Sequence, residues 1–245
     1  MSSHLQSSPV PSQVAPQIHS VQVGRIQPFT RKGTSSAIAK HQIEGRVRVQ
    51  MLGLSGDEQA DKKVHGGPDK AIHAYPLEHY AFWNADLLKD HVLLQKPGAF
   101  GENLTTRGLT EQNICIGDRW SIGTVLLEVS QGRQPCWKLD DRFSVKGLCR
   151  RVQDTRLTGW YFRVIEPGVL QAGEEITLQA RPYPEWSIKR VMDLLWGRKA
   201  DPELLKSASE LPLPSSWTHR FAERARDSSS VSNESARLDG PGTAA

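Results

Sequence analysis

One cysteine, flanked by cationic side chains, carries the most specific chemistry in this 245-residue sequence. Cys136 follows Pro135 in the stretch VSQGRQPCWKL, with Arg133 before it and Lys138 after it. Neighbouring cations lower the pKa of a cysteine thiol from about 8.5 and favour the thiolate, which is a nucleophile and a soft metal ligand. The pattern therefore indicates a reactive cysteine or a ligand for a soft metal. A cysteine packed under a loop is the alternative.

Three other segments are too polar for a core and too patterned for a linker. They read GTSSAIAK, LGLSGDEQADKKVHGGPDKAIHAY and GAFGENLTTRGL. Adjacent glycines let backbone amides approach a ligand closely, and lysine or histidine beside them completes an anion cradle. Each segment also has a plainer interpretation as a turn, a hairpin loop or a solvated run of charges. The candidate binding residues in them are Ser36, Lys40, Asp57, Lys63, His65, Gly66, Gly67, Glu102 and Asn103.

Other catalytic classes find little support in the motifs. The spacing of His65, His73 and His79 matches no zinc signature. The sequence has no G-x-S-x-G elbow, which disfavours a serine hydrolase of that type. It also has no G-x-G-x-x-G fingerprint and no P-loop, so a dinucleotide or nucleoside triphosphate site of either kind is not expected.

Composition and charge disfavour several further classes of protein. Three cysteines, at positions 115, 136 and 149, give neither a fully paired disulfide framework nor the four ligands of an iron–sulfur cluster. The net charge of +4, from 31 basic and 27 acidic residues, is too mild to indicate a nucleic-acid polymer as partner. No stretch approaches the roughly 18 to 20 apolar residues of a membrane span, and the N-terminus lacks the features of a secretory signal. We therefore expect a cytoplasmic protein with no membrane partner.

Alternating apolar residues predict that the central part of the chain is mainly β. The period of two is seen in VQVGRIQPF, GRVRVQML, NICIGDRWSIGTVLLEVSQ, WYFRVI and EEITLQ, with glycine-rich turns between them. Many short strands of this kind favour a barrel or a sandwich. Two helices are predicted, in PLEHYAFWNADLLKDH and in SVKGLCRRVQDT, and the second places Cys149 on an apolar face that belongs to the core.

The two ends of the chain differ from this central part. Three amphipathic helices are predicted in residues 185–228, with Asp201 as N-cap of the second and Ser215 or Ser216 as N-cap of the third. Residues 1–20 and 229–245 are rich in small polar side chains and are expected to be disordered.

Taken together, the segments SAIAK, GLSGDEQADKKVHGGPDKAIHAYP, GAFGENLTTRGL, IGDRW and SQGRQPCWKL resemble the MOSC-domain proteins of the YiiM type. The resemblance runs in unbroken order from about Val21 to Ala180, and the three predicted helices resemble the small domain that follows MOSC in this group. It implies a MOSC β-barrel with a few short helices in residues 21–182, followed by a three-helix C-terminal domain.

The resemblance also implies a cofactor and a reaction. MOSC domains of this type bind the molybdenum cofactor (Mo-molybdopterin), a pterin dithiolene with a phosphate, and the family cysteine that coordinates molybdenum falls on Cys136. Arg133 and Lys138 would favour the thiolate and attract the phosphate. YiiM-type proteins are similar to reductases of N-hydroxylated compounds such as 6-hydroxylaminopurine, which is returned to adenine. Gly132 stands where a proline is expected, which predicts a looser loop.

The implied reaction needs a proton donor and a source of electrons. His65 and Glu102 are the candidate acids, although either side chain is equally suited to holding the pterin. The sequence has no flavin or NAD fingerprint, so we expect the electrons to come from a separate flavin or iron–sulfur reductase. The expected substrate is a small N-hydroxylated molecule, and the expected state is a monomer or a homodimer.

Two other functions stay open at this stage. In one, the domain carries a molybdenum cofactor, or sulfur as a persulfide on Cys136, without reductase turnover. In the other, the barrel is inert and the helical domain recruits protein partners.

Overall fold

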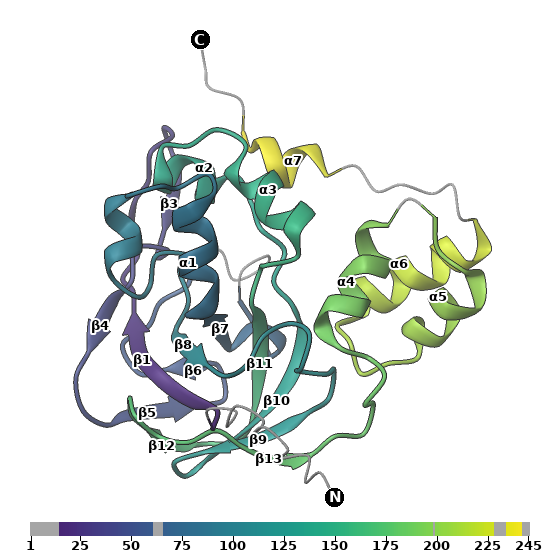
Figure 1. Cartoon of the computed structure of the whole chain (residues 1–245), viewed down its shortest axis with the longest axis horizontal. Helices are drawn as coiled ribbons and strands as arrows, with labels where there is room; N and C mark the ends of the chain where they lie inside the picture. The colour runs from purple at the N-terminus through teal and green to yellow at the C-terminus, as the bar shows by residue number, and fades with distance from the viewer. Residues whose placement is uncertain (1–14, 61–65, 198, 228–233, 242–245) are drawn as a thin grey trace, which may run out of the picture.

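Eight strands form one strongly curled sheet around the larger hydrophobic core (Figure 1). The computed structural model describes residues 15–60, 66–197, 199–227 and 234–241. The strand order is β13-β9-β10-β11-β7-β8-β1-β4, and β7 and β8 form its one parallel pair within these described ranges. The strands are β1 (Gln17–Val23), β4 (His41–Ile43), β7 (Ile72–Pro76), β8 (Leu104–Arg107), β9 (Arg119–Ile122), β10 (Val125–Gly132), β11 (Trp160–Glu166) and β13 (Thr177–Ala180).

The curled sheet is a partly closed barrel. Strand β1, near one edge of the sheet, is joined to the segment before β13 at the other edge. Ile18 N donates to Glu174 O at 2.9 Å, and Ile176 N donates to Pro16 O at 2.8 Å. This confirms the predicted mainly β, barrel-like class. Two smaller sheets complete the β structure: β12 (Gly168–Leu170) with β5 (Val47–Gln50) and β6 (Gly53–Leu54), and β2 (Gln27–Pro28) with β3 (Ser35–Ser36).

Alternation along β11 decides which side chains reach the core and which face away. Trp160, Phe162 and Val164 are buried in the core, whereas Tyr161 and Arg163 between them are only partly buried. Successive side chains of a strand point to opposite faces, so the same pattern that fills the core sends Tyr161 to the other face of the sheet.

Three short helices cover one end of the barrel (Figure 1). They enclose a second apolar cluster that includes Trp83, Phe100 and Phe143, and it also contains Cys149, which confirms the predicted core position of that cysteine. Two 3₁₀ turns, η1 (Pro68–Lys70) and η2 (Val92–Gln95), lie in the connecting segments. The helices are α1 (Glu78–Ala85), α2 (Lys138–Phe143) and α3 (Leu148–Thr155).

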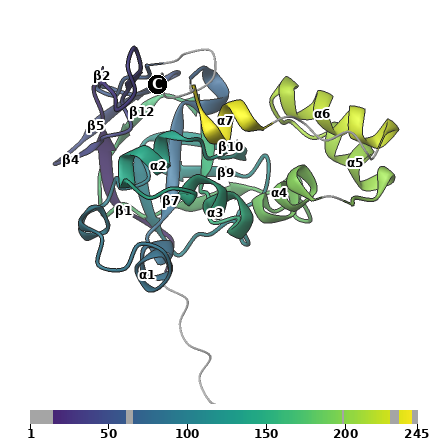
Figure 2. The ribbon, with the colours of Figure 1, turned by 90° about the horizontal axis from the view of Figure 1, so that it is seen from above.

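The three-helix domain lies beside the barrel and consists of α4 (Ile188–Trp196), α5 (Pro202–Ser209) and α6 (Ser215–Arg226) (Figure 2). The Asp201 carboxylate accepts a hydrogen bond from Glu203 N at 3.0 Å, so the predicted cap of α5 is confirmed. The predicted serine cap of α6 is wrong. Pro214 is the extended residue before this helix, and Ser215 is already helical.

The structure corrects the predicted borders of both tails. Strand β1 begins at Gln17, inside the segment 1–20 that was expected to be disordered, because Ile18 already belongs to the core. The expected disorder of 229–245 is wrong for a short helix, α7 (Ser235–Asp239), whose Leu238 is buried in the second cluster. A single leucine in a polar segment carries no periodicity, so this helix depends on tertiary contacts. Of the helices in the described ranges, none is both long and apolar enough to cross a membrane.

Candidate functional site

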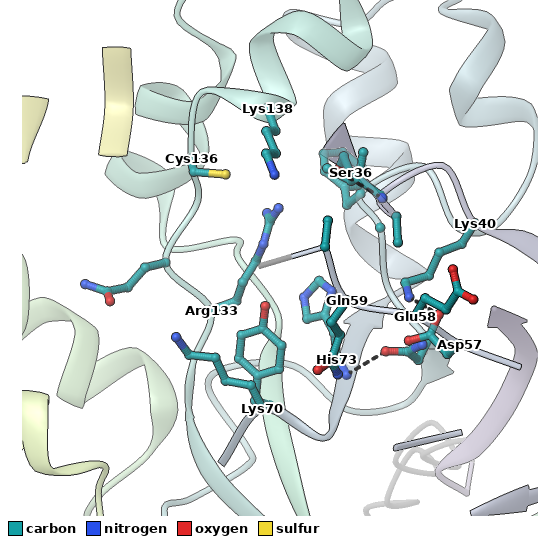
Figure 3. A pocket seen from close by; sticks show the side chains of 18 residues that line it. Ser36, Lys40, Asp57, Glu58, Gln59, Lys70, His73, Arg133, Cys136 and Lys138 are labelled. Atoms are coloured by element: carbon teal, nitrogen blue, oxygen red, sulfur yellow. Dashed lines mark hydrogen bonds and ion pairs between the residues drawn. The ribbon is translucent and has the colours of Figure 1, made fainter. Parts of the chain in front are cut away.

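Two adjoining cavities open at the end of the barrel where β10 leads into α2. The inner cavity has a volume of about 100 Å³ (Figure 3). The outer cavity has a volume of about 610 Å³, within the range of small-molecule sites. Cys136, Lys138 and Tyr161 are among the residues that line both.

Backbone hydrogen bonds fix the loop that carries Cys136. Arg133 N, directly after β10, donates to Gly159 O at 3.0 Å, and Leu139 N in α2 donates to Cys136 O at 2.9 Å. Cys136 is only 7% exposed, and it lines both cavities. The thiol therefore lies in a defined place at the centre of the site.

Arg133 is a buried cation with one unpaired donor atom. Its side chain is 6% exposed, and its Nη1 has no hydrogen-bond partner within the described part of the chain. In Figure 3 the guanidinium extends toward the side of the cavity that holds Cys136 and Lys138. Leaving a buried donor unpaired costs about 1 to 3 kcal/mol, which an anionic ligand would offset. Lys138 also faces this space, and its Nζ donates to Ser35 O at 3.0 Å.

Lys40 and Asp57 form a buried ion pair at the other side of the inner cavity. The Lys40 ammonium donates to Asp57 Oδ1, which also accepts from Gly24 N at 2.7 Å. Burial lowers the pKa of Lys40 below its usual value, while Asp57 acts in the opposite direction. Because the charge of Lys40 is already balanced by Asp57, the pair shapes the cavity wall and adds little net charge to it.

His73 and Tyr161 belong to the site although the sequence did not single them out for it. They are cross-strand partners on β7 and β11, with ring centroids 5.1 Å apart. Burial and the nearby Arg133 cation hold the pKa of His73 well below 6.5, so the ring is neutral. Burial raises the pKa of Tyr161, so its phenol stays protonated at neutral pH. The alternation in WYFRVI places Tyr161 on the face opposite the core residues, and this pattern could have identified it.

Most of the predicted binding residues meet at the inner cavity. Asn103 holds the strand of His73, since its Oδ1 accepts from His73 N at 3.1 Å (Figure 3). The predicted residues that line this cavity are Ser36, Lys40, Asp57, Asn103, Arg133, Cys136 and Lys138.

The glycine-rich segment is only partly described. Lys63 and His65 lie outside the described residues, so their predicted roles stay predictions. Gly66 and Gly67 do not line either cavity. Gly67 has a φ of +92° with open space where a Cβ would stand, which leaves its backbone accessible.

Glu102 belongs to the framework behind the cavity and does not line it. The carboxylate is fully buried and accepts hydrogen bonds from Gly98 N, Phe100 N and the hydroxyls of Tyr80 and Thr105. A carboxylate surrounded by four donors is held as the acceptor. This geometry argues against the predicted role of Glu102 as a proton donor.

Gly132 has a packing role, which corrects the expectation of a looser loop. This residue ends β10 and is fully enclosed. A Cβ at position 132 would overlap Met192 Sδ and lie 2.9 Å from Met192 Cγ. The glycine makes room for α4, and its pairing with Trp160 keeps it within the sheet.

The donor set suits a soft metal that brings its own organic ligands. No group of three or more His, Cys, Asp or Glu side chains in the described ranges is placed to hold a bare metal ion. Cys136 offers one sulfur in the same cavity as the buried Arg133 guanidinium, which keeps one donor atom unpaired among the described residues. A pterin dithiolene supplies further sulfur ligands and an anionic phosphate, so the residues present fit the molybdenum cofactor.

Comparisons with known proteins agree with the geometry. Residues 61–177 match the MOSC domain, and residues 186–224 match the YiiM-like, 3-alpha helix domain. Protein YiiM of Escherichia coli (strain K12) is 40% identical over 224 residues, which cover 90% of this chain and 97% of that protein. A protein of Gibberella moniliformis (strain M3125 / FGSC 7600) named "Reductase" is 37% identical over 226 residues, covering 91% of this chain and 40% of that protein. The crystal structure of YiiM from Geobacillus stearothermophilus has a TM-score of 0.72 and 32% identity, covering 86% of this chain and 99% of that one.

Proposed function

The chain belongs to the MOSC-domain proteins of the YiiM type, and from this premise we propose that it is a molybdenum cofactor-dependent reductase of small N-hydroxylated compounds, such as 6-hydroxylaminopurine. The observation that carries the proposal is that Cys136 lines one cavity together with the buried Arg133 guanidinium, whose Nη1 has no hydrogen-bond partner within the described part of the chain. The relative named as a reductase supports the reaction class.

In this proposal the cofactor extends across the two adjoining cavities, and residues of the inner wall anchor it. Cys136 Sγ is the protein ligand of molybdenum. Arg133 Nη1 and Lys138 Nζ bind the phosphate, because a guanidinium and an ammonium suit phosphate oxygens. The bound cofactor supplies two-electron redox chemistry and affinity for the oxygen of the substrate. Ser36 and Asn103 complete the wall beside it.

The outer cavity is the proposed place of the substrate. Its 610 Å³ accommodates a molecule of the size of a purine base, and Cys136 and Tyr161 line it together. Reduction of an N–OH group to N–H consumes two electrons and two protons, breaks the N–O bond and releases water. The Tyr161 phenol is the proposed acid for the departing oxygen, since it is protonated and lines both cavities.

The electrons come, in this proposal, from a separate flavin or iron–sulfur protein. In this proposal the donor approaches the site from the side of the outer cavity, which Cys136 lines. A cytoplasmic location and a monomeric or homodimeric state complete the proposal.

An assay with an artificial electron donor tests the proposal. The protein would be purified from a host that makes the cofactor, and the conversion of 6-hydroxylaminopurine to adenine by reduced viologen would be measured. We expect turnover by the wild type, loss of turnover in Cys136→Ser and retained turnover in Cys115→Ser. In the wild type the Cys115 thiol contacts Pro184 O and lines neither cavity. Cofactor-loaded protein without turnover on any N-hydroxylated compound would instead favour the carrier function.

A further inference from the structure

The C-terminal helix α7 is packed against the loop that carries the site cysteine. It lies next to α2 and α3 (Figure 1). It also contacts the three-helix domain, because the Glu234 carboxylate directly before α7 accepts hydrogen bonds from Trp196 Nε1 at 3.1 Å and from Arg220 Nη2 at 3.4 Å. Trp137 N donates to Arg237 O at 2.9 Å, and the Arg237 guanidinium donates to Pro135 O. One residue of α7 therefore holds the neighbours of Cys136 on both sides.

Further contacts fix α7 in this position. Leu238 is 5% exposed, and its carbonyl accepts from Cys149 Sγ at 3.4 Å. Arg31 Nη1 donates to Asp239 O at 2.7 Å and to Pro241 O at 2.8 Å. These bonds tie the end of the chain to the barrel, to α3 and to the second core cluster.

Gly240 brings the backbone after α7 onto the ring of Trp137. A Cβ at position 240 would lie 2.5 Å from Trp137 Cγ, and the φ of +71° is a conformation that L side chains rarely adopt. The close approach thus requires a glycine at this point. The backbone at Gly240 therefore covers Trp137, the residue that directly follows Cys136.

The same segment forms part of the site wall. Ala236 and Arg237 line the outer cavity together with Cys136, Trp137 and Lys138. A segment that both lines the cavity and anchors the loop affects how Cys136 Sγ is placed and what reaches it.

We propose that residues 234–241 are a working part of the site, in which Arg237 is a positioning residue that fixes the Cys136 loop and α7 restricts access to the Cys136 thiol. These contacts act on the exposure of one thiol, whether the protein is a reductase or a cofactor carrier.

Thiol reactivity in cofactor-free protein tests this directly. Full-length protein would be purified from a host that lacks the cofactor and alkylated with iodoacetamide, and the rate at each cysteine would be followed by peptide mass spectrometry. We expect Arg237→Ala and Gly240→Val to speed alkylation of Cys136 by about ten-fold or more, which corresponds to about 1.4 kcal/mol. Cys115, whose thiol donates to Pro184 O at 3.4 Å, serves as the internal control.

Two further variants separate positioning from general loosening. Arg226→Ala removes an exposed arginine of α6 that hydrogen-bonds only its own helix in the described contacts, and we expect wild-type rates from it. Arg237→Lys keeps a donor for Pro135 O, and we expect it to restore part of the protection. Unchanged alkylation of Cys136 in both α7 variants would overturn the proposal, as would equal acceleration at Cys115 and Cys136. Because no turnover is measured, these outcomes are independent of the proposed reductase activity.

Discussion

A methyl group added at Gly132 tests how tightly the helical domain is joined to the site. The new Cβ would overlap Met192 Sδ and approach Ile188 Cγ2 to 3.4 Å. Met192 is fully buried, and its sulfur accepts from Thr158 Oγ1 at 3.5 Å, so its side chain has little free space to move into. Overpacking of this kind costs about 1 to 3 kcal/mol, and we expect Gly132→Ala to lower the free energy of unfolding by that amount.

A double-mutant cycle isolates the contact from other effects of the substitution. Met192→Ala alone removes a buried side chain and should cost about 2 to 5 kcal/mol. In the background of Met192→Ala the methyl group at position 132 fills vacated space, so its own cost should fall close to zero. The coupling energy is then about 1 to 3 kcal/mol, with the double variant more stable than the sum of the single effects predicts.

Urea unfolding, followed by circular dichroism and tryptophan fluorescence, gives the four free energies of the cycle. The barrel and the helical domain both contain tryptophans, so the two probes also report whether they unfold together. Additivity within about 0.5 kcal/mol would refute the reasoning, because it would show that position 132 and Met192 do not share the same space.

Three further predictions concern single buried groups. The pKa of His73 lies well below 6.5 in the folded protein, so below pH 6.5 the unfolded chain gains a proton that the folded chain does not. This group should lower the free energy of unfolding by up to about 1.4 kcal/mol for each unit by which the pH falls. In His73→Gln the free energy of unfolding should depend less steeply on pH. Identical slopes for the two proteins in urea titrations at several pH values would contradict this. Glu102→Gln replaces one carboxylate oxygen by an NH2 group, which then faces at least one existing donor. We expect the free energy of unfolding in urea to fall by about 1 to 3 kcal/mol, and an unchanged midpoint would be the opposing result. Asp57→Asn leaves the buried Lys40 ammonium without its charge partner, and the free energy of unfolding should fall by about 3 to 5 kcal/mol. Adding Lys40→Met should restore part of this stability. A further fall in the double variant would show that the pair is not coupled.

Local pattern explains why much of the fold was predictable. Strands such as Val125–Gly132 carry their own period of two, and helices such as Ile188–Trp196 carry their own apolar face, so each is visible within its own segment. Arg133, Cys136 and Lys138 were identifiable because one loop brings all three to the cavity.

The missed features depend on partners that lie far away in the sequence. Tyr161 and His73 meet because β11 pairs with β7, and no local pattern states that pairing. Gly132 could be judged only after α4 had been placed against it. Helix α7 consists of polar residues around Leu238, and its position depends on Arg237 reaching Pro135 O across 102 residues.

The molybdenum and pterin content of the purified protein tests the central claim most directly. Wild type and Cys136→Ala would be produced in a host that makes the cofactor, with Cys115→Ala as a matched change of a second buried cysteine. The proposed ligand role predicts metal and pterin near one per chain in wild type and in Cys115→Ala, and marked depletion of both in Cys136→Ala. Equal metal in all three proteins would contradict the assignment of Cys136 as the ligand, and metal absent from all three would contradict the reductase itself.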